Sequence, residues 1–143
     1  MSDSLPLSWQ MVGFQDFLGI RVVDWEPDQV ALELVVEPHH LNRSGIVHGG
    51  VLSTLLDVAM SFAGLHCEAP DQLRKAMTLS LTTTFVAPAK GDVLRVIGRL
   101  EGGGSSTFMA SGRVFDSEGN LVAMGEGSFR RRRGSEAGEG QSQ

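Results

Sequence analysis

The segment HGGVLSTLLDVAMSFAGL, residues 48–65, decides the fold of this chain. Its apolar residues recur at helical spacing, and additional apolar residues widen the apolar face beyond a single stripe. The pattern therefore predicts a helix over residues 51–65 that is buried on most of its sides. Pro70 and Asp71 mark the exit from this segment.

Strand patterns lie on both sides of the helix. Before it, residues 20–25 and 30–37 are rich in β-branched or alternating apolar residues, and the turn at residues 26–28 joins them. After it, turn-rich segments separate four further predicted strands, at residues 76–87, 92–100, 106–115 and 121–131. One long helix between a strand pair and four strands predicts an α+β domain in which a curved antiparallel sheet wraps around the helix.

The ends of the chain carry weaker patterns. Met11, Phe14 and Phe17 recur at helical spacing and predict a short helix over residues 8–18, although Gly13 interrupts it. No segment after residue 131 could contribute to a core. We therefore expect one domain over residues 1–131 and a disordered tail over residues 132–143.

The composition excludes several classes of partner and compartment. The 143 residues carry a formal net charge of −5, whereas binding along nucleic-acid phosphates needs a basic face, which this chain lacks outside residues 130–133. No apolar run approaches the length of a membrane span, and the N-terminus has no signal-peptide pattern. Cys67 is the one cysteine, so an internal disulfide cannot form. We expect a cytoplasmic protein that binds neither nucleic acid nor membranes.

Asp57 is an unexpected residue in a helix that is predicted to be buried. A carboxylate is costly to remove from water, and no cation stands three or four positions away on the same helix. Ser53, Thr54 and Ser61 form a thin polar stripe together with it. One interpretation is a carboxylate placed to act as a general base or a nucleophile. The other interpretation is that this stripe simply faces water.

The start of the helix lacks the usual capping residue. Helices commonly begin with Ser, Thr, Asp or Asn, whose side chains bond to the first N–H groups. Here His48 is followed by Gly49 and Gly50, so the N–H groups and the positive end of the helix are open to a polarised carbonyl oxygen. The alternative is that the two glycines serve only a tight turn.

The spacing of these two features predicts an oligomer. Asp57 lies eight residues after Gly49, and at about 1.5 Å rise per residue the two are roughly 12 Å apart along one helix. One chain cannot bring both to the same carbonyl group. If they cooperate, a second subunit must place its helix antiparallel alongside, which gives two equivalent sites per dimer.

Two motifs together resemble a known family. They are Asn42-x2-Gly45-x2-His48-Gly49-Gly50-x6-Asp57 and the sequence TTFVAPAKGD at residues 83–92. In combination they resemble the PaaI-like branch of the hotdog-fold acyl-CoA thioesterases, which includes the phenylacetyl-CoA thioesterases. The resemblance runs from about residue 17 to residue 129. It implies a hotdog fold, in which a sheet wraps a central helix.

The resemblance also implies an activity and roles for individual residues. The expected reaction is hydrolysis of an acyl- or aryl-acetyl-CoA thioester to the free acid and CoA. Asp57 would be the base or nucleophile, and the Gly49 N–H of the other subunit would polarise the carbonyl group. Asn42 would orient the water or the carboxylate. His48 would hold the thioester or help the thiolate to leave.

Further residues are expected near the substrate. Thr78 would position a water molecule, a role that Ser61 could also serve. Because CoA carries three phosphates, basic groups are expected at the mouth of the site. The alternative for the arginines is a solvated edge and tail, and it is the favoured interpretation for Arg132 and Arg133. The expected CoA-binding residues are Gly50, Lys90, Arg130 and Arg131.

The resemblance implies a dimer with shared sites, and a homotetramer formed by two such dimers. It implies no metal and no cofactor, since CoA is part of the substrate. Two other functions remain open for a hotdog domain. One is dehydration of a hydroxyacyl thioester, and the other is acyl-CoA binding without turnover.

Overall fold

A computed structural model describes residues 5–132 of the chain. It contains one six-stranded antiparallel sheet, with strand order β1-β2-β4-β5-β6-β3. The strands are β1 (Arg21–Glu26), β2 (Gln29–Val35), β3 (Ala76–Phe85), β4 (Val93–Gly103), β5 (Thr107–Phe115) and β6 (Leu121–Arg131). All six predicted strands are confirmed, with ends that differ by at most a few residues.

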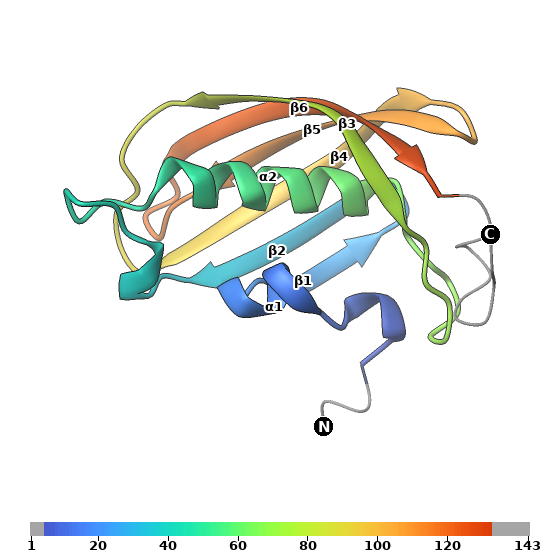
Figure 1. Ribbon diagram of the computed structural model, residues 1–143, viewed down its shortest axis with the longest axis horizontal. Coiled ribbons are helices and arrows are strands. Elements are labelled where there is room, and N and C mark those ends of the chain that lie inside the picture. The colour runs from blue at the N-terminus through green and yellow to red at the C-terminus, as the bar shows by residue number, and fades with distance from the viewer. Residues whose placement is uncertain (1–4, 133–143) are drawn as a thin grey trace.

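The central helix α2 (Gly49–Ala63) lies in the hollow of the curved sheet (Figure 1). The predicted α+β architecture, with a sheet wrapped around one long helix, is confirmed. Eight residues of the helix are buried: Val51, Leu52, Leu55, Leu56, Val58, Ala59, Met60 and Ala63. No helix within residues 5–132 has the length and apolar character needed to cross a bilayer.

A row of three glycines lets α2 approach the sheet closely. Gly98 of β4 pairs with Gly112 of β5, which in turn pairs with Gly125 of β6. A Cβ atom on Gly98 would collide with the carbonyl oxygen of Ala59, and one on Gly112 would lie 3.0 Å from Leu56 Cδ2. At Gly98 the backbone of the helix therefore rests against the backbone of the sheet, and at Gly112 the Leu56 side chain packs directly against the strand.

Gly98→Ala is therefore expected to destabilise the protein. Overpacking a closely packed core typically costs about 1–3 kcal/mol, and here the added methyl group meets main-chain atoms, which cannot rotate away. The matched control is Gly102→Ala on the same strand, where a Cβ would meet no atom within 4 Å. Thermal or urea unfolding should show a clearly lower free energy of unfolding for Gly98→Ala and little change for Gly102→Ala. Equal stability of the two variants would contradict this account of the row.

The N-terminal segment differs from its prediction. Instead of one helix over residues 8–18, there is a 3-10 helix η2 (Leu7–Trp9) and a short α-helix α1 (Gly13–Leu18). Gly13 adopts a positive φ of 61°, which interrupts the regular helix. Phe14 and Phe17 are 62% and 73% exposed, so neither side chain belongs to the core. The predicted disordered tail, apart from Arg132, lies outside the described residues.

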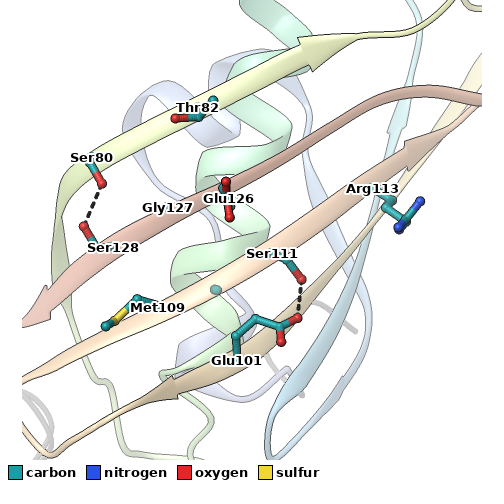
Figure 2. A pocket seen from close by; sticks show the side chains of 10 residues that line it. Ser80, Thr82, Glu101, Met109, Ser111, Arg113, Glu126, Gly127 and Ser128 are labelled. Carbon is teal, nitrogen blue, oxygen red and sulfur yellow. Dashed lines mark hydrogen bonds between the residues drawn. The ribbon is translucent and has the colours of Figure 1, made fainter.

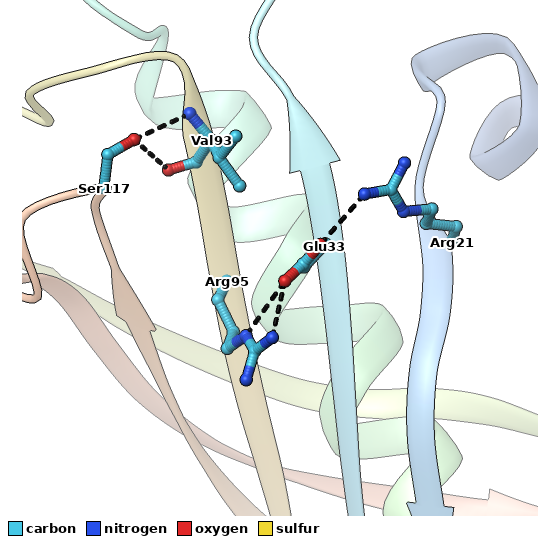
Figure 3. Close-up of polar contacts among 5 residues, drawn as sticks. All are labelled: Arg21, Glu33, Val93, Arg95 and Ser117. Carbon is cyan, nitrogen blue, oxygen red and sulfur yellow. Dashed lines mark hydrogen bonds and ion pairs between the residues drawn. The ribbon is translucent and has the colours of Figure 1, made fainter.

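The outer face of the sheet is held together by ionic contacts (Figure 3). Glu33 of β2 accepts hydrogen bonds from Arg95 of β4 and from Arg21 of β1, at 2.6 and 2.9 Å. These two bonds hold the pKa of the Glu33 carboxyl below its usual value. The contacts tie three neighbouring strands together on the face that lies away from α2.

Candidate active site

Asp57 lies on the side of α2 that faces β3. Its side chain is half-buried, and the Thr78 hydroxyl donates a hydrogen bond of 2.7 Å to Asp57 Oδ1. Within residues 5–132 no cation forms an ion pair with this carboxylate. This bond fixes one carboxylate oxygen of Asp57. The sequence had indicated a different role for Thr78, the positioning of a water molecule, and that role stays a prediction.

The N-terminus of α2 is capped by a residue other than the usual Ser, Thr, Asp or Asn. His48 is the N-cap residue, and its Nδ1 accepts a 2.8 Å hydrogen bond from the Gly50 N–H. The expectation that both glycine amides are open was therefore wrong for Gly50, because an imidazole nitrogen takes the place of the usual cap oxygen. Since Nδ1 is the acceptor, the neutral ring carries its proton on Nε2.

Gly49 keeps an available amide. Its N–H forms no hydrogen bond with any group in the described part of the chain, whereas the amides of Val51 and Leu52 bond to the His48 carbonyl oxygen. The ring of Phe85 lies over this residue, since a Cβ on Gly49 would be 3.2 Å from two ring atoms. The free donor therefore stands beside an aromatic wall at the positive end of the helix.

An apolar hollow of about 360 Å³ opens at this end of α2. It is lined by Ile46, Val47, Gly49, Leu52, Phe85, Val86, Ala87, Pro88 and Ala89. Residues 83–92 were recognised from the sequence as a motif, but of these only Lys90 was predicted to take part in the site. Their role depends on the end of β3 returning to the start of α2, which no local pattern reveals.

Asn42 organises the loop before the helix. Its Oδ1 accepts the N–H groups of Ser44 and Ile46, at 2.9 and 3.1 Å, and its own N–H bonds to the Ile46 carbonyl oxygen. The carbonyl end of the side chain is therefore used within the loop. Only its NH₂ group remains to meet a substrate or a water molecule in the role predicted for it.

His40 is fully buried and has a structural role. Its Nδ1 accepts the Glu37 N–H, and its Nε2 lies 2.8 Å from the Leu18 carbonyl oxygen. The ring thus ties the short helix η3 (Pro38–His40) to the end of α1. Across residues 5–132, no three His, Cys, Asp or Glu side chains gather as metal ligands would.

The basic residues predicted to bind CoA differ in their contacts and exposure. The guanidinium of Arg131 donates to the carbonyl oxygens of Gly64 and Gly104, at 3.1 and 2.6 Å, and lies 4.6 Å from the ring centre of Phe108. Arg131 therefore fastens the end of α2 to the β4–β5 turn and is poorly placed to bind phosphate. Arg130 is exposed and lies on β6 opposite Met77, next to Thr78. Lys90 is exposed and directly follows Ala89, which lines the apolar hollow.

Another hollow, of about 680 Å³, lies on the outer face of the sheet (Figure 2). Its lining is polar and includes Glu126, Arg113 and two hydrogen-bonded pairs, Ser80–Ser128 and Ser111–Glu101. Neither Asp57 nor Gly49 lines it. It is therefore separate from the candidate active site.

One chain thus holds two separate halves of a site. Asp57 and Thr78 lie at one place along α2, whereas Gly49, His48 and the apolar hollow lie roughly 12 Å away at its start. No contact in the described residues joins the two halves. A carboxylate and an unbonded amide facing one carbonyl group would form a hydrolytic site, but a single subunit does not assemble it.

Comparisons with known proteins identify the family. The model of the thioesterase superfamily matches residues 44–123, which include both halves of the site. Acyl-coenzyme A thioesterase 13 of Homo sapiens is 31% identical over 117 residues, covering 78% of this chain and 80% of the relative. PA0474 of Pseudomonas aeruginosa, provisionally assigned as an esterase, is 35% identical over 102 residues, covering 71% and 74%. The chain belongs to the thioesterase superfamily and is a thioesterase.

Solved structures share the fold. The conserved protein PA5202 of Pseudomonas aeruginosa superposes with a TM-score of 0.76 at 24% identity, covering 85% of this chain and 95% of that one. The PaaI protein of Escherichia coli, from the phenylacetic acid degradation operon, gives a TM-score of 0.72 at 24% identity and covers 85% of each chain. The predicted hotdog fold is confirmed.

Proposed function

We propose that this protein hydrolyses acyl-CoA thioesters, including medium-chain or aryl-acetyl derivatives, at sites shared between two subunits. The observation that carries the proposal is the division of the site into two incomplete halves. One half offers a carboxylate held by Thr78, and the other offers the unbonded Gly49 amide beside an apolar hollow. The relatives named as acyl-CoA thioesterases support the choice of substrate.

The exposed edge of the sheet supports the dimer. β3 is an edge strand of ten residues, and its apolar residues Met77 and Leu79 are 53% and 47% exposed. An uncovered apolar edge is a surface that proteins usually pair or protect. If β3 pairs with its own copy, α2 of one subunit runs antiparallel beside α2 of the other, and each Asp57 faces a Gly49 of the partner subunit.

The proposed chemistry needs only the Asp57 carboxylate, the Gly49 amide and the His48 ring. Asp57 removes a proton from water, or attacks directly, and the new C–O bond forms at the thioester carbon while the Gly49 N–H stabilises the oxyanion. The C–S bond then breaks, and the thiolate leaves and takes up a proton. The Nε2–H of His48 is suited to donate to the departing sulfur. In the direct-attack route, water afterwards hydrolyses the anhydride to the free acid.

Two basic residues are proposed to bind the phosphates of CoA. In the shared site, Asp57 of one subunit lies next to Gly49 of the other. Arg130 then comes from the subunit that supplies Asp57, and Lys90 comes from the subunit that supplies Gly49. Both side chains are exposed. Pairing of two dimers into a homotetramer and a cytoplasmic location are further parts of the proposal, the second supported by the single cysteine.

A thiol-release assay tests the proposal. The purified protein is incubated with short, medium, long and aryl-acetyl CoA esters and with a hydroxyacyl-CoA, while free thiol and enoyl product are measured. We expect thiol release from at least the medium-chain or aryl-acetyl esters and no enoyl product, because the relatives that match this chain are named as thioesterases and esterases. Enoyl formation without thiol release would identify a dehydratase. Tight binding without turnover would identify an acyl-CoA-binding protein.

A further inference from the structure

Three residues of α2 line up along β3. Gly49, Ser53 and Asp57 follow each other at intervals of four positions, so they share one face of the helix. Gly49 lies under the ring of Phe85, and Asp57 accepts the hydrogen bond from Thr78. Between them, Ser53 Oγ donates to Thr83 Oγ1 at 3.2 Å. The middle contact is thus a pair of hydroxyl groups, and the reaction proposed above makes no use of it.

The shared site fixes where a two-fold axis must pass. Ser53 is four residues from Gly49 and four from Asp57, about 6 Å from each along the helix. If Gly49 of one subunit faces Asp57 of the other in both directions, the midpoint of that interval is the position that faces its own copy. That midpoint is Ser53.

The hydroxyl pair has the chemistry that such a position requires. Each hydroxyl has one hydrogen to donate and can accept others. Ser53 donates to Thr83 within the chain, and Thr83 has no recorded acceptor for its own hydrogen within residues 5–132. Both side chains are half-buried. Two copies related by a two-fold axis can therefore close a ring in which each Thr83 donates to Ser53 of the partner subunit, with four donors matched to four acceptors.

We propose that the two-fold axis of the dimer passes beside the Ser53–Thr83 pair, and that the resulting ring of four hydroxyls sets the register between the two helices. This inference rests on the proposed function. In this arrangement Ser53 is a positioning residue, because the hydrogen bond that it accepts from Thr83 of the partner subunit places both Asp57–Gly49 pairs at once. The partner that this face of α2 recognises is a second copy of the same chain.

Cysteine cross-linking tests where the axis lies. In a Cys67→Ser background, which removes the one native cysteine, Ser53→Cys is treated with a short bismaleimide and analysed on a denaturing gel. We expect most of the protein to become a covalent dimer. The matched control is Ser61→Cys, since Ser61 is also half-buried on the polar stripe but lies eight residues further on. Its two copies would be about 24 Å apart along the helices, so little dimer should form.

The alternative outcomes are decisive. Equal cross-linking of the two variants, or none with Ser53→Cys in a protein whose native mass is that of a dimer, would place the axis elsewhere. Labelling with N-ethylmaleimide confirms that both thiols are accessible. If Ser53→Cys does not fold, Thr83→Cys replaces it, because its thiol lies on the same pair and is expected to cross-link in the same way.

Sharing of the site is measured separately. Subunits carrying Asp57→Asn are mixed, by unfolding and refolding together, with subunits carrying Gly49→Pro. Half of the randomly mixed dimers contain one of each, and each of these has one intact site out of two, so about a quarter of the wild-type activity should return. Recovery without Ser53 cross-linking would overturn the position of the axis alone. Absence of recovery would overturn the shared site itself.

Discussion

Asp57→Asn is expected to lower turnover at least about a hundredfold, while the oligomer and its melting temperature stay close to those of the wild type. An asparagine keeps the shape of the side chain, and its Oδ1 can still accept the hydrogen bond from Thr78. What it removes is the negative charge and the ability to take a proton or attack a carbonyl carbon. The measurement is thiol release under saturating acyl-CoA, with size-exclusion chromatography and thermal unfolding on the same samples.

A matched control separates this effect from a general loss of charge. Asp24→Asn removes one negative charge from the exposed strand β1, far along the sheet from β3. Its turnover should equal that of the wild type. If Asp57→Asn hydrolyses acyl-CoA at a nearly normal rate, the reacting group must be sought elsewhere in the chain.

Gly49→Pro is expected to cost about 10²–10³ in turnover, because it deletes the one amide hydrogen proposed to stabilise the oxyanion. Proline is well tolerated at the first position of a helix, where no hydrogen bond within the helix is lost. His48 already has φ −62° and ψ 136°, a conformation that suits a residue before proline. The fold should therefore survive, which circular dichroism and the native mass can verify.

Gly49→Ala is the control for this substitution. It adds the same Cβ atom near the ring of Phe85 but keeps the N–H group. We expect a much smaller loss of turnover than for the proline variant. If the two variants lose activity equally, crowding against Phe85 explains the loss, and the amide has no special role.

The sequence predicted the architecture well because the patterns that determine it are local. The alternation in β2 and the wide apolar face of α2 can be seen directly in the residues. The N-terminal helix was predicted too long because its apolar spacing continues across Gly13, whereas the backbone there takes a positive φ. Apolar spacing alone does not show whether a surface exists for Phe14 and Phe17 to cover.

The site was predicted in part. Asp57 stood out as a charge without a partner on its own helix in an apolar segment, whereas the hydrogen bond that it accepts from Thr78 was not predicted. Two features depend on contacts that spacing cannot show. One is the His48 imidazole acting as the helix cap, and the other is Phe85 closing over Gly49. Arg131 was misjudged because nothing in a run of arginines indicates that one of them is bound to main-chain carbonyl groups.

The row formed by Gly98, Gly112 and Gly125 also has a consequence for chemistry far from it. The helix α2 packs directly on this row, and the same helix carries Gly49 at its start and Asp57 past its middle. A methyl group on Gly98 would meet the main chain of Ala59, push α2 away from the sheet and displace both reacting groups together. Glycines that contact no substrate thereby determine how far the Gly49 amide and the Asp57 carboxylate lie from the sheet.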